Sequence, residues 1–197
     1  MPYAYIANRT DMLNADKLLN YYDENIERIS EILKIPKEDI PRNVALFLEP
    51  GEDCSYNREE RRIIYRFKNE GDLLVDRGRL IHEAAHVVQN YPFKIHQQHP
   101  CWCWMEGIAD YCRVILDPDF NLENDLTHEP EKGYKEAAHF LNWLSKEYTS
   151  LISDLNLLIR DKAEVLNNHN QIFDILLQKN FSQLKREYIY SMINKQT

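Results

Sequence analysis

The sequence predicts an α+β domain in which a small N-terminal sheet precedes a mostly helical C-terminal half. Two short apolar runs, residues 44–50 and 61–68, have the length and pattern of strands. From residue 134 onward, apolar side chains recur at steps of three and four, which is typical of amphipathic helices. Strands that precede a block of helices, instead of alternating with them, are typical of α+β folds.

Length and composition favour one domain with its own core. The chain has 197 residues, of which 44% are hydrophobic, and a chain of this size can bury a sizeable apolar core. We expect one domain over residues 1–197 with three regions. These are a helical lead-in (1–40), the sheet lying over a histidine-bearing helix (41–92), and a helical region (93–197).

The N-terminal half is expected to contain one helix and two strands. A helix should run from about Asp11 to Leu33, because apolar residues recur at helical spacing and Pro36 prevents its continuation. The run "VALFLEP" is expected to form a buried strand that ends at the Pro-Gly turn. The run "RRIIYRFK" alternates with a period of two, which predicts a strand with one solvent-facing side, at the edge of the sheet.

The remaining elements are expected to be helical. One helix covers residues 72–91, before Pro92, and a second covers residues 101–116 despite Gly107. Residues 117–133 are rich in turn-forming residues and should form a surface loop. The last four helices are expected at residues 134–148, 150–166, 170–178 and 182–194.

Charge and hydropathy exclude several classes of partner. The net charge is −8, and the densest basic run, residues 58–66, is interleaved with Glu59 and Glu60, so we expect no nucleic-acid partner. No apolar stretch reaches the ~18 residues that span a bilayer. The N-terminus lacks the features of a signal peptide, which predicts a cytoplasmic protein if the chain is complete and a secreted one if a leader was removed. Nothing in the sequence indicates an oligomeric state.

The segment "LIHEAAHVVQNYP" contains the strongest functional signal. His82 and His86 are four residues apart, so a helix places both imidazoles on one face, as two ligands of one metal ion require. Glu83 follows the first histidine, where a glutamate can accept a proton from metal-activated water. The alternative is a surface helix that happens to carry two histidines.

A catalytic zinc needs a third protein ligand and one open position. The segment "WMEGIADYC" offers Glu106 and, one helical turn later, Asp110. We expect Glu106 to bind the metal and Asp110 to accept an N–H from a ligating histidine. The reverse assignment, with Asp110 on the metal, stays open on spacing alone.

Other metal-binding and aromatic residues have simpler interpretations. His96, His99, Cys101 and Cys103 match no usual zinc-ligand spacing. Cys101 and Cys112 are expected to be buried apolar groups. The three tryptophans, Trp102, Trp104 and Trp143, are expected in the core, with a substrate-lining role as the alternative.

The paired motifs resemble a known peptidase family. "HEAAHVVQ" followed by "EGIADY" is similar to the family that includes plant basic secretory proteins and their bacterial relatives. With "GYKEAAHFLNWL" and the closing helices, the resemblance covers about residues 44–188. More distantly, "WMEGIADY" resembles the zinc-binding stretch of gluzincin aminopeptidases, which favours Glu106 over Asp110. This chain departs from the plant members, which are basic and carry a signal peptide.

The resemblance implies a zincin-like metallopeptidase fold and one Zn²⁺ per chain, held by His82, His86 and Glu106. It also implies a peptide or protein substrate, which adds as a strand to the edge of the sheet, and Glu83 as the general base. Tyr134, in the family-like "GYK" segment, is our choice for the donor to the oxyanion, with His128 and His139 as runners-up. The alternative for Tyr134 is a tyrosine that packs at the start of a helix. The alternative function is a zincin-fold binding or regulatory protein whose metal is mainly structural.

Overall fold

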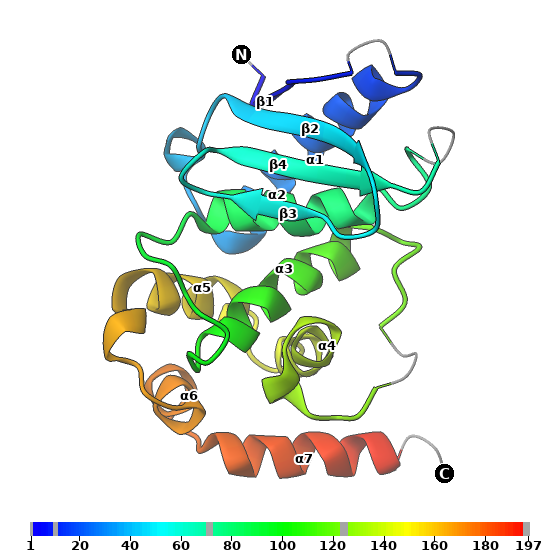
Figure 1. Cartoon of the computed structure of the whole chain (residues 1–197). Helices are drawn as coiled ribbons and strands as arrows, with labels where there is room; N and C mark the ends of the chain where they lie inside the picture. Colours follow the sequence, from blue (N-terminus) through cyan, green and yellow to red (C-terminus); the bar gives the residue numbers. More distant parts are fainter. Residues whose placement is uncertain (1, 10–11, 70–72, 123–125, 195–197) are drawn as a thin grey trace. The chain divides into compact units, whose positions relative to one another are not determined.

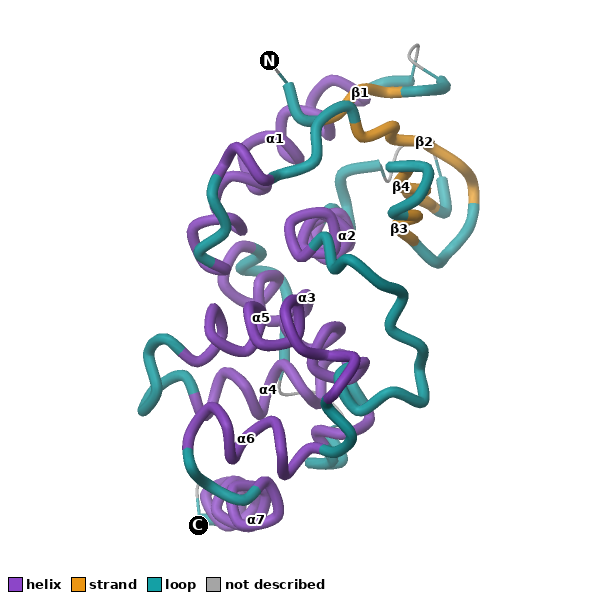
Figure 2. Tube along the Cα trace, turned by 90° about the vertical axis from the view of Figure 1, so that its left-hand side faces the viewer, coloured by secondary structure: helices purple, strands orange, loops and turns teal. Residues whose placement is uncertain are grey.

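The computed structural model describes residues 2–9, 12–69, 73–122 and 126–194. Over these residues the chain is a mixed α+β protein with a four-stranded sheet and seven α-helices (Figure 1). It divides into two compact units, one formed by Met1–Asn90 with Ile115–Phe120 and the other by Tyr91–Val114 with Asn121–Thr197. Every strand belongs to the first unit, so the predicted α+β class, with a small N-terminal sheet and a helical C-terminal half, is confirmed (Figure 2).

The sheet of the first unit is mostly parallel. Its strands β1 (Ala4–Ile6), β2 (Val44–Pro50), β3 (Ser55–Asn57) and β4 (Arg62–Phe67) lie in the order β1-β2-β4-β3. β1 pairs with β2 in parallel, β2 pairs with β4 in parallel, and only β3 runs antiparallel to its neighbour β4. The strand expected at residues 44–50 is therefore confirmed.

The predicted edge position of "RRIIYRFK" is wrong. β4 is paired on both sides, by β2 and by β3, so in the described part of the sheet β3 forms that edge. The alternation with a period of two correctly predicts which side chains of β4 are buried, namely Ile63, Tyr65 and Phe67. A face pattern says nothing about lateral pairing, however, because backbone hydrogen bonds lie in the plane of the sheet. The pairing strand β3 has only three residues, too few to show a period.

Two helices pack together on one face of this sheet. α1 (Ala15–Leu33) and α2 (Gly78–Gln89) contact each other, and both lie on the same side of the strands (Figures 1 and 2). The predicted end of α1 at Leu33 is confirmed, whereas part of its predicted start, residues 10–11, lies outside the described residues. None of the described helices is long and apolar enough to cross a membrane.

α2 begins later than the sequence pattern suggests. Residues 73–77 form turns, and residue 72, where the helix was expected to start, is outside the described residues. The carbonyl oxygen of Leu73 accepts a hydrogen bond from the Tyr65 hydroxyl at 3.0 Å. This bond links the turn to β4, so apolar residues that have helical spacing in the sequence lie in a turn before α2.

The second unit is built from helices. They are α3 (Trp102–Leu116, its last two residues excepted), α4 (Tyr134–Leu144), α5 (Leu151–Lys162), α6 (His169–Leu177) and α7 (Phe181–Ile193), with short 3₁₀ turns at Pro130–Lys132 and Ala163–Val165. An aromatic cluster fills the core, consisting of Trp104, Phe140, Phe173, Phe181 and Tyr188. All the C-terminal helices expected from the sequence are present, within a few residues of their predicted bounds.

Candidate metal centre

The face of α2 that carries His82 and His86 is arranged for a shared ligand. Their Nε2 atoms lie 3.1 Å apart, and their rings meet edge to face with centroids 4.7 Å apart. Two imidazole nitrogens bound to one tetrahedral zinc lie about 3.3 Å apart, because each Zn–N bond is about 2.0–2.1 Å long. The spacing predicted from the i, i+4 pattern is therefore also the spacing that a single ion needs.

The local sequence explains why these histidines are presented together. The opposite face of α2 is apolar and buried, with Leu80, Ile81, Ala84, Val87 and Val88 in the core. Burial of that face fixes the rotation of the helix and leaves both histidines half-buried. The helix ends at Gln89, and the next residue, Asn90, has a left-handed backbone and donates its N–H to the His86 carbonyl at 3.1 Å.

Gln89 orients the second histidine, a role that the sequence interpretation did not assign. Its Oε1 atom lies 2.7 Å from Nδ1 of His86, and the Gln89 side chain is buried. An amide oxygen can only accept, so His86 carries its proton on Nδ1 and turns the lone pair of Nε2 toward His82. The signal was present in the sequence, because Gln89 stands three residues after His86 and shares its helical face.

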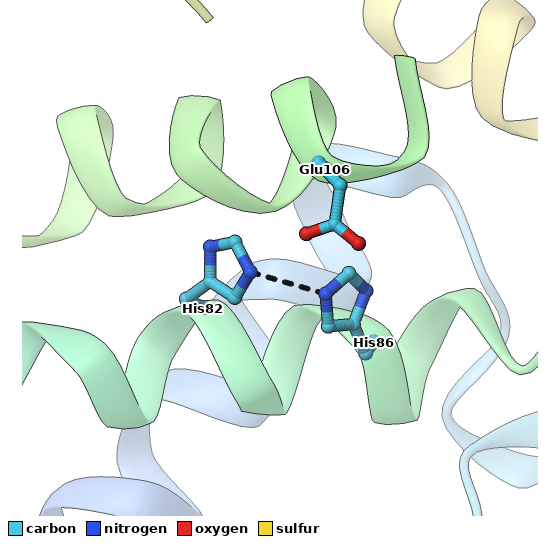
Figure 3. A group of neighbouring side chains, drawn as sticks. All are labelled: His82, His86 and Glu106. Carbon is cyan, nitrogen blue, oxygen red and sulfur yellow. Dashed lines mark hydrogen bonds between the residues drawn. The ribbon is translucent and has the colours of Figure 1, made fainter. Parts of the chain in front are cut away.

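Glu106 belongs with the two histidines to a group of side chains that could hold a metal ion. The ligand atoms of His82, His86 and Glu106 all lie within 4.8 Å of one another, and Figure 3 shows the three side chains directed toward a common point. Among the described residues, this is the group of histidine, cysteine and acidic side chains that can hold a metal ion. Two imidazoles and one carboxylate form a donor set found in catalytic zinc sites.

The other predicted acidic residues are buried nearby in their own helices. Glu83 lies on α2 directly after His82 and is 6% exposed, and Asp110 lies on α3 one turn after Glu106 and is also 6% exposed. Buried carboxylates are rare unless they are paired or bind metal. His86 directs its Nδ1 to Gln89, so a hydrogen bond from a ligating histidine to Asp110 stays a prediction for His82.

The three candidates for the oxyanion donor differ in their surroundings. His128 and His139 both direct Nδ1 at the buried hydroxyl of Tyr188, at 3.4 and 2.7 Å. Tyr134 instead opens α4 and is 49% exposed. The two histidines therefore contact a buried hydroxyl inside the second unit, whereas about half of the Tyr134 side chain is exposed.

The histidines and cysteines around the start of α3 form no second metal-binding group within the described residues. Burial raises the pKa of Cys101 to about 12 and also raises the pKa of Cys103. His99 accepts the backbone N–H of Cys101 at 3.1 Å, which is a local turn contact. The expected burial of Cys101 and Cys112 is confirmed.

Comparison with known protein families gives a match over the region that carries the candidate site. No curated protein and no solved structure matched the chain. A family model described as "Peptidase of plants and bacteria" matches residues 67–188. The matched region contains α2 with His82, Glu83 and His86 and also α3 with Glu106, and it covers more than half of the 197 residues. The chain thus belongs to the family of peptidases of plants and bacteria.

Proposed function

We propose that this chain is a zinc-dependent metallopeptidase with a zincin-like fold, in which His82, His86 and Glu106 bind one Zn²⁺. The observation that carries the proposal is the convergence of these three ligand atoms within 4.8 Å. The hydrogen bond from His86 to Gln89 adds to it, because ligating histidines almost always donate their second ring N–H to such a partner. Two imidazoles also argue against Mg²⁺ or Ca²⁺, which prefer all-oxygen ligands.

The residues around the metal divide the work of peptide hydrolysis. When bound, zinc acidifies water and polarises a carbonyl group. Glu83, directly beside the ligand His82, takes the proton of the attacking water and delivers it to the leaving amine. The developing oxyanion needs a hydrogen-bond donor, which we assign to the hydroxyl of Tyr134. Asp110 is assigned to hold the surrounding ligands in orientation.

The substrate of such a site is a peptide, and β3 offers a place for it. Ser55 and Asn57 of this edge strand are exposed, and β3 packs against α2, which carries both histidines. An extended peptide that pairs with the outer backbone of β3 gains main-chain hydrogen bonds regardless of its sequence. We therefore place the substrate along β3, in place of β4.

The test combines metal analysis with a cleavage assay. The purified protein should contain about one zinc per chain and cleave casein, and a chelator should abolish cleavage, with recovery on adding Zn²⁺. Changing His82 and His86 together to Ala should remove both zinc and activity. Zinc without cleavage of any tested protein would favour a binding protein with a structural metal, and unchanged zinc in the double variant would place the site elsewhere.

A further inference from the structure

The backbone at the start of α4 is strained. Gly133 has φ +82° and Tyr134 has φ +48°, both in the left-handed region. Glycine adopts this region freely, but a bulky aromatic residue does so only where its surroundings enforce it. Such strained positions are concentrated at functional sites. The consequence here is that the Tyr134 side chain projects outward, 49% exposed, instead of packing into the aromatic core.

The indole of Trp102 packs against this strained turn. Its ring meets the Tyr134 ring edge to face, with centroids 5.4 Å apart and an interplanar angle of 84°. A Cβ atom on Gly133 would lie only 2.9 Å from a ring carbon of Trp102, so the indole rests directly on the Gly133 backbone. Trp102 therefore contacts both residues of the turn, one through its backbone and one through its ring.

A second close contact fixes α4 against α3. A Cβ atom on Gly107 would lie 2.4 Å from the Cβ of Ala137, which means that the two helices touch at this point. Gly107 directly follows Glu106, and Ala137 lies about one turn after Tyr134. Trp102 and Glu106 are four residues apart and share one face of α3. Contacts within the second unit thus link the position of Tyr134 to that of Glu106.

We infer that Trp102, seated on Gly133, is a positioning residue that holds the Tyr134 hydroxyl at the correct place relative to the Glu106 carboxylate. This rests on the proposed function, in which Tyr134 donates to the oxyanion and Glu106 binds the metal. An oxyanion donor is effective only if it is already aimed before the reaction, because a displacement of about 1 Å can cost ~10²-fold in rate.

The first test reads the position of Tyr134 without any catalysis. 3-Fluorotyrosine is placed at residue 134, and its ¹⁹F resonance is recorded in the wild-type background and with Trp102→Ala, Trp102→Phe or Trp143→Ala. Trp143 is a matched control because it is also half-buried on unit two but packs against Phe140 and Tyr188. Trp102→Ala should move the resonance toward its solvent value, Trp102→Phe less so, and Trp143→Ala should leave it unchanged. An unmoved resonance in Trp102→Ala overturns the inference.

The second test is a double-mutant cycle on a fluorogenic peptide that the wild type cleaves. Tyr134→Phe should lower kcat by about 10²-fold with little change in KM, as expected for loss of one oxyanion donor. Trp102→Ala should also lower kcat, by roughly 10-fold or more, with zinc content unchanged. The two changes together should lower kcat no further than Tyr134→Phe alone, because both act through one hydroxyl. Trp102→Phe should recover part of the loss.

The outcomes separate this inference from the proposed function. If the two kcat losses multiply, or if Trp102→Ala raises KM and leaves kcat unchanged, Trp102 does not act through Tyr134 and the inference is wrong. In either case the metallopeptidase activity of the wild type would still stand. If the wild type cleaves nothing, the proposed function fails, whereas the ¹⁹F measurement still tests the positioning of Tyr134.

Discussion

His86 and Gln89 are joined by a 2.7 Å hydrogen bond between Nδ1 and Oε1, one turn apart on α2. Replacing Gln89 with Ala should lower zinc affinity by about 10–100-fold, since His86 loses the partner that fixes its tautomer and ring orientation. Affinity is measured by competition with a chromogenic chelator at one pH, because protons compete for the imidazole. Gln183→Ala on α7, whose amide bonds Glu187, is the matched control. Equal affinities for the two variants would contradict the assigned role.

Glu83→Gln should separate chemistry from metal binding. The substitution keeps the size of a side chain that is 6% exposed, so the fold and the zinc content should be retained. Activity should fall by ~10²–10⁴-fold, the typical contribution of a general base. Glu59→Gln, at an exposed position, should be silent. The mechanism is refuted by an active Glu83→Gln enzyme, and loss of zinc from this variant would make Glu83 a ligand.

Glu106→Ala and Asp110→Ala should differ in the size of their effect on the metal. Glu106 belongs to the group of converging ligand atoms, so its loss should abolish stable zinc binding. Asp110→Ala should weaken binding by only about 10–100-fold, as for a residue that orients ligands. Both variants are titrated with the same chelator at the same pH. The reverse order would exchange the two assignments, and two mild losses would point to a ligand on another segment.

Gly107→Ala should destabilise the second unit although alanine is the better helix former. The new methyl group would meet the Ala137 Cβ at 2.4 Å, and neither group can rotate away. Overpacking of this kind costs about 1–3 kcal/mol, which exceeds the gain of up to about 1 kcal/mol from helix propensity. The free energy of unfolding is measured in urea. Adding Ala137→Gly should restore part of the loss, and no such recovery would mean that the two helices are not in contact there.

Acid should weaken the aromatic core through His169. Its Nδ1 accepts the indole N–H of Trp104 at 3.1 Å. Burial, the largest cause, lowers the pKa of His169, with Glu131 opposing and Lys185 adding to the shift. The unfolded chain therefore binds this proton more readily, so the stabilisation is complete above the unfolded pKa near 6.5 and is lost as the pH falls through the folded value.

His169→Gln tests this pH dependence. Glutamine keeps an acceptor for Trp104 but cannot titrate, so its free energy of unfolding should fall less between pH 7 and pH 5 than that of the wild type. Both proteins are measured in a chelator, which removes any contribution from metal release at low pH. Parallel pH profiles would show that His169 is not responsible.

The sequence predicts those residues of the site that lie close together on one helix. His82, Glu83 and His86 lie within a single turn, so their spacing determines their geometry. Glu106 lies twenty residues further along the chain, and it was preferred over Asp110 by family resemblance, because both acids share one face of α3. The role of Gln89 depends on a side-chain rotamer, which no spacing specifies.

The fold was predictable where elements are long enough to show a period. α1 and the C-terminal helices cover several turns each, and β2 spans seven residues. β1 and β3 have three residues each, which is too short for an alternating pattern to be recognised in the sequence. The inner position of β4 could not be predicted, because it depends on pairing with β3. α2 starts later than its apolar pattern predicts, and Leu73 in the preceding turn accepts a hydrogen bond from Tyr65 of β4, a contact that local propensity does not encode.

The parallel pairing of β1 with β2 affects how this protein folds. Ala4 pairs with Val44 and Ile6 with Leu46, and the whole of α1 lies between the two strands in the chain. Such a pair cannot form as a hairpin. During synthesis, β1 therefore cannot pair with β2 until residues past Pro50 have left the ribosome. Non-local pairing of this kind slows folding. Until it is complete, the backbone of β2 is open to strands of other chains, and a deletion or bulky fusion at the N-terminus should therefore promote aggregation.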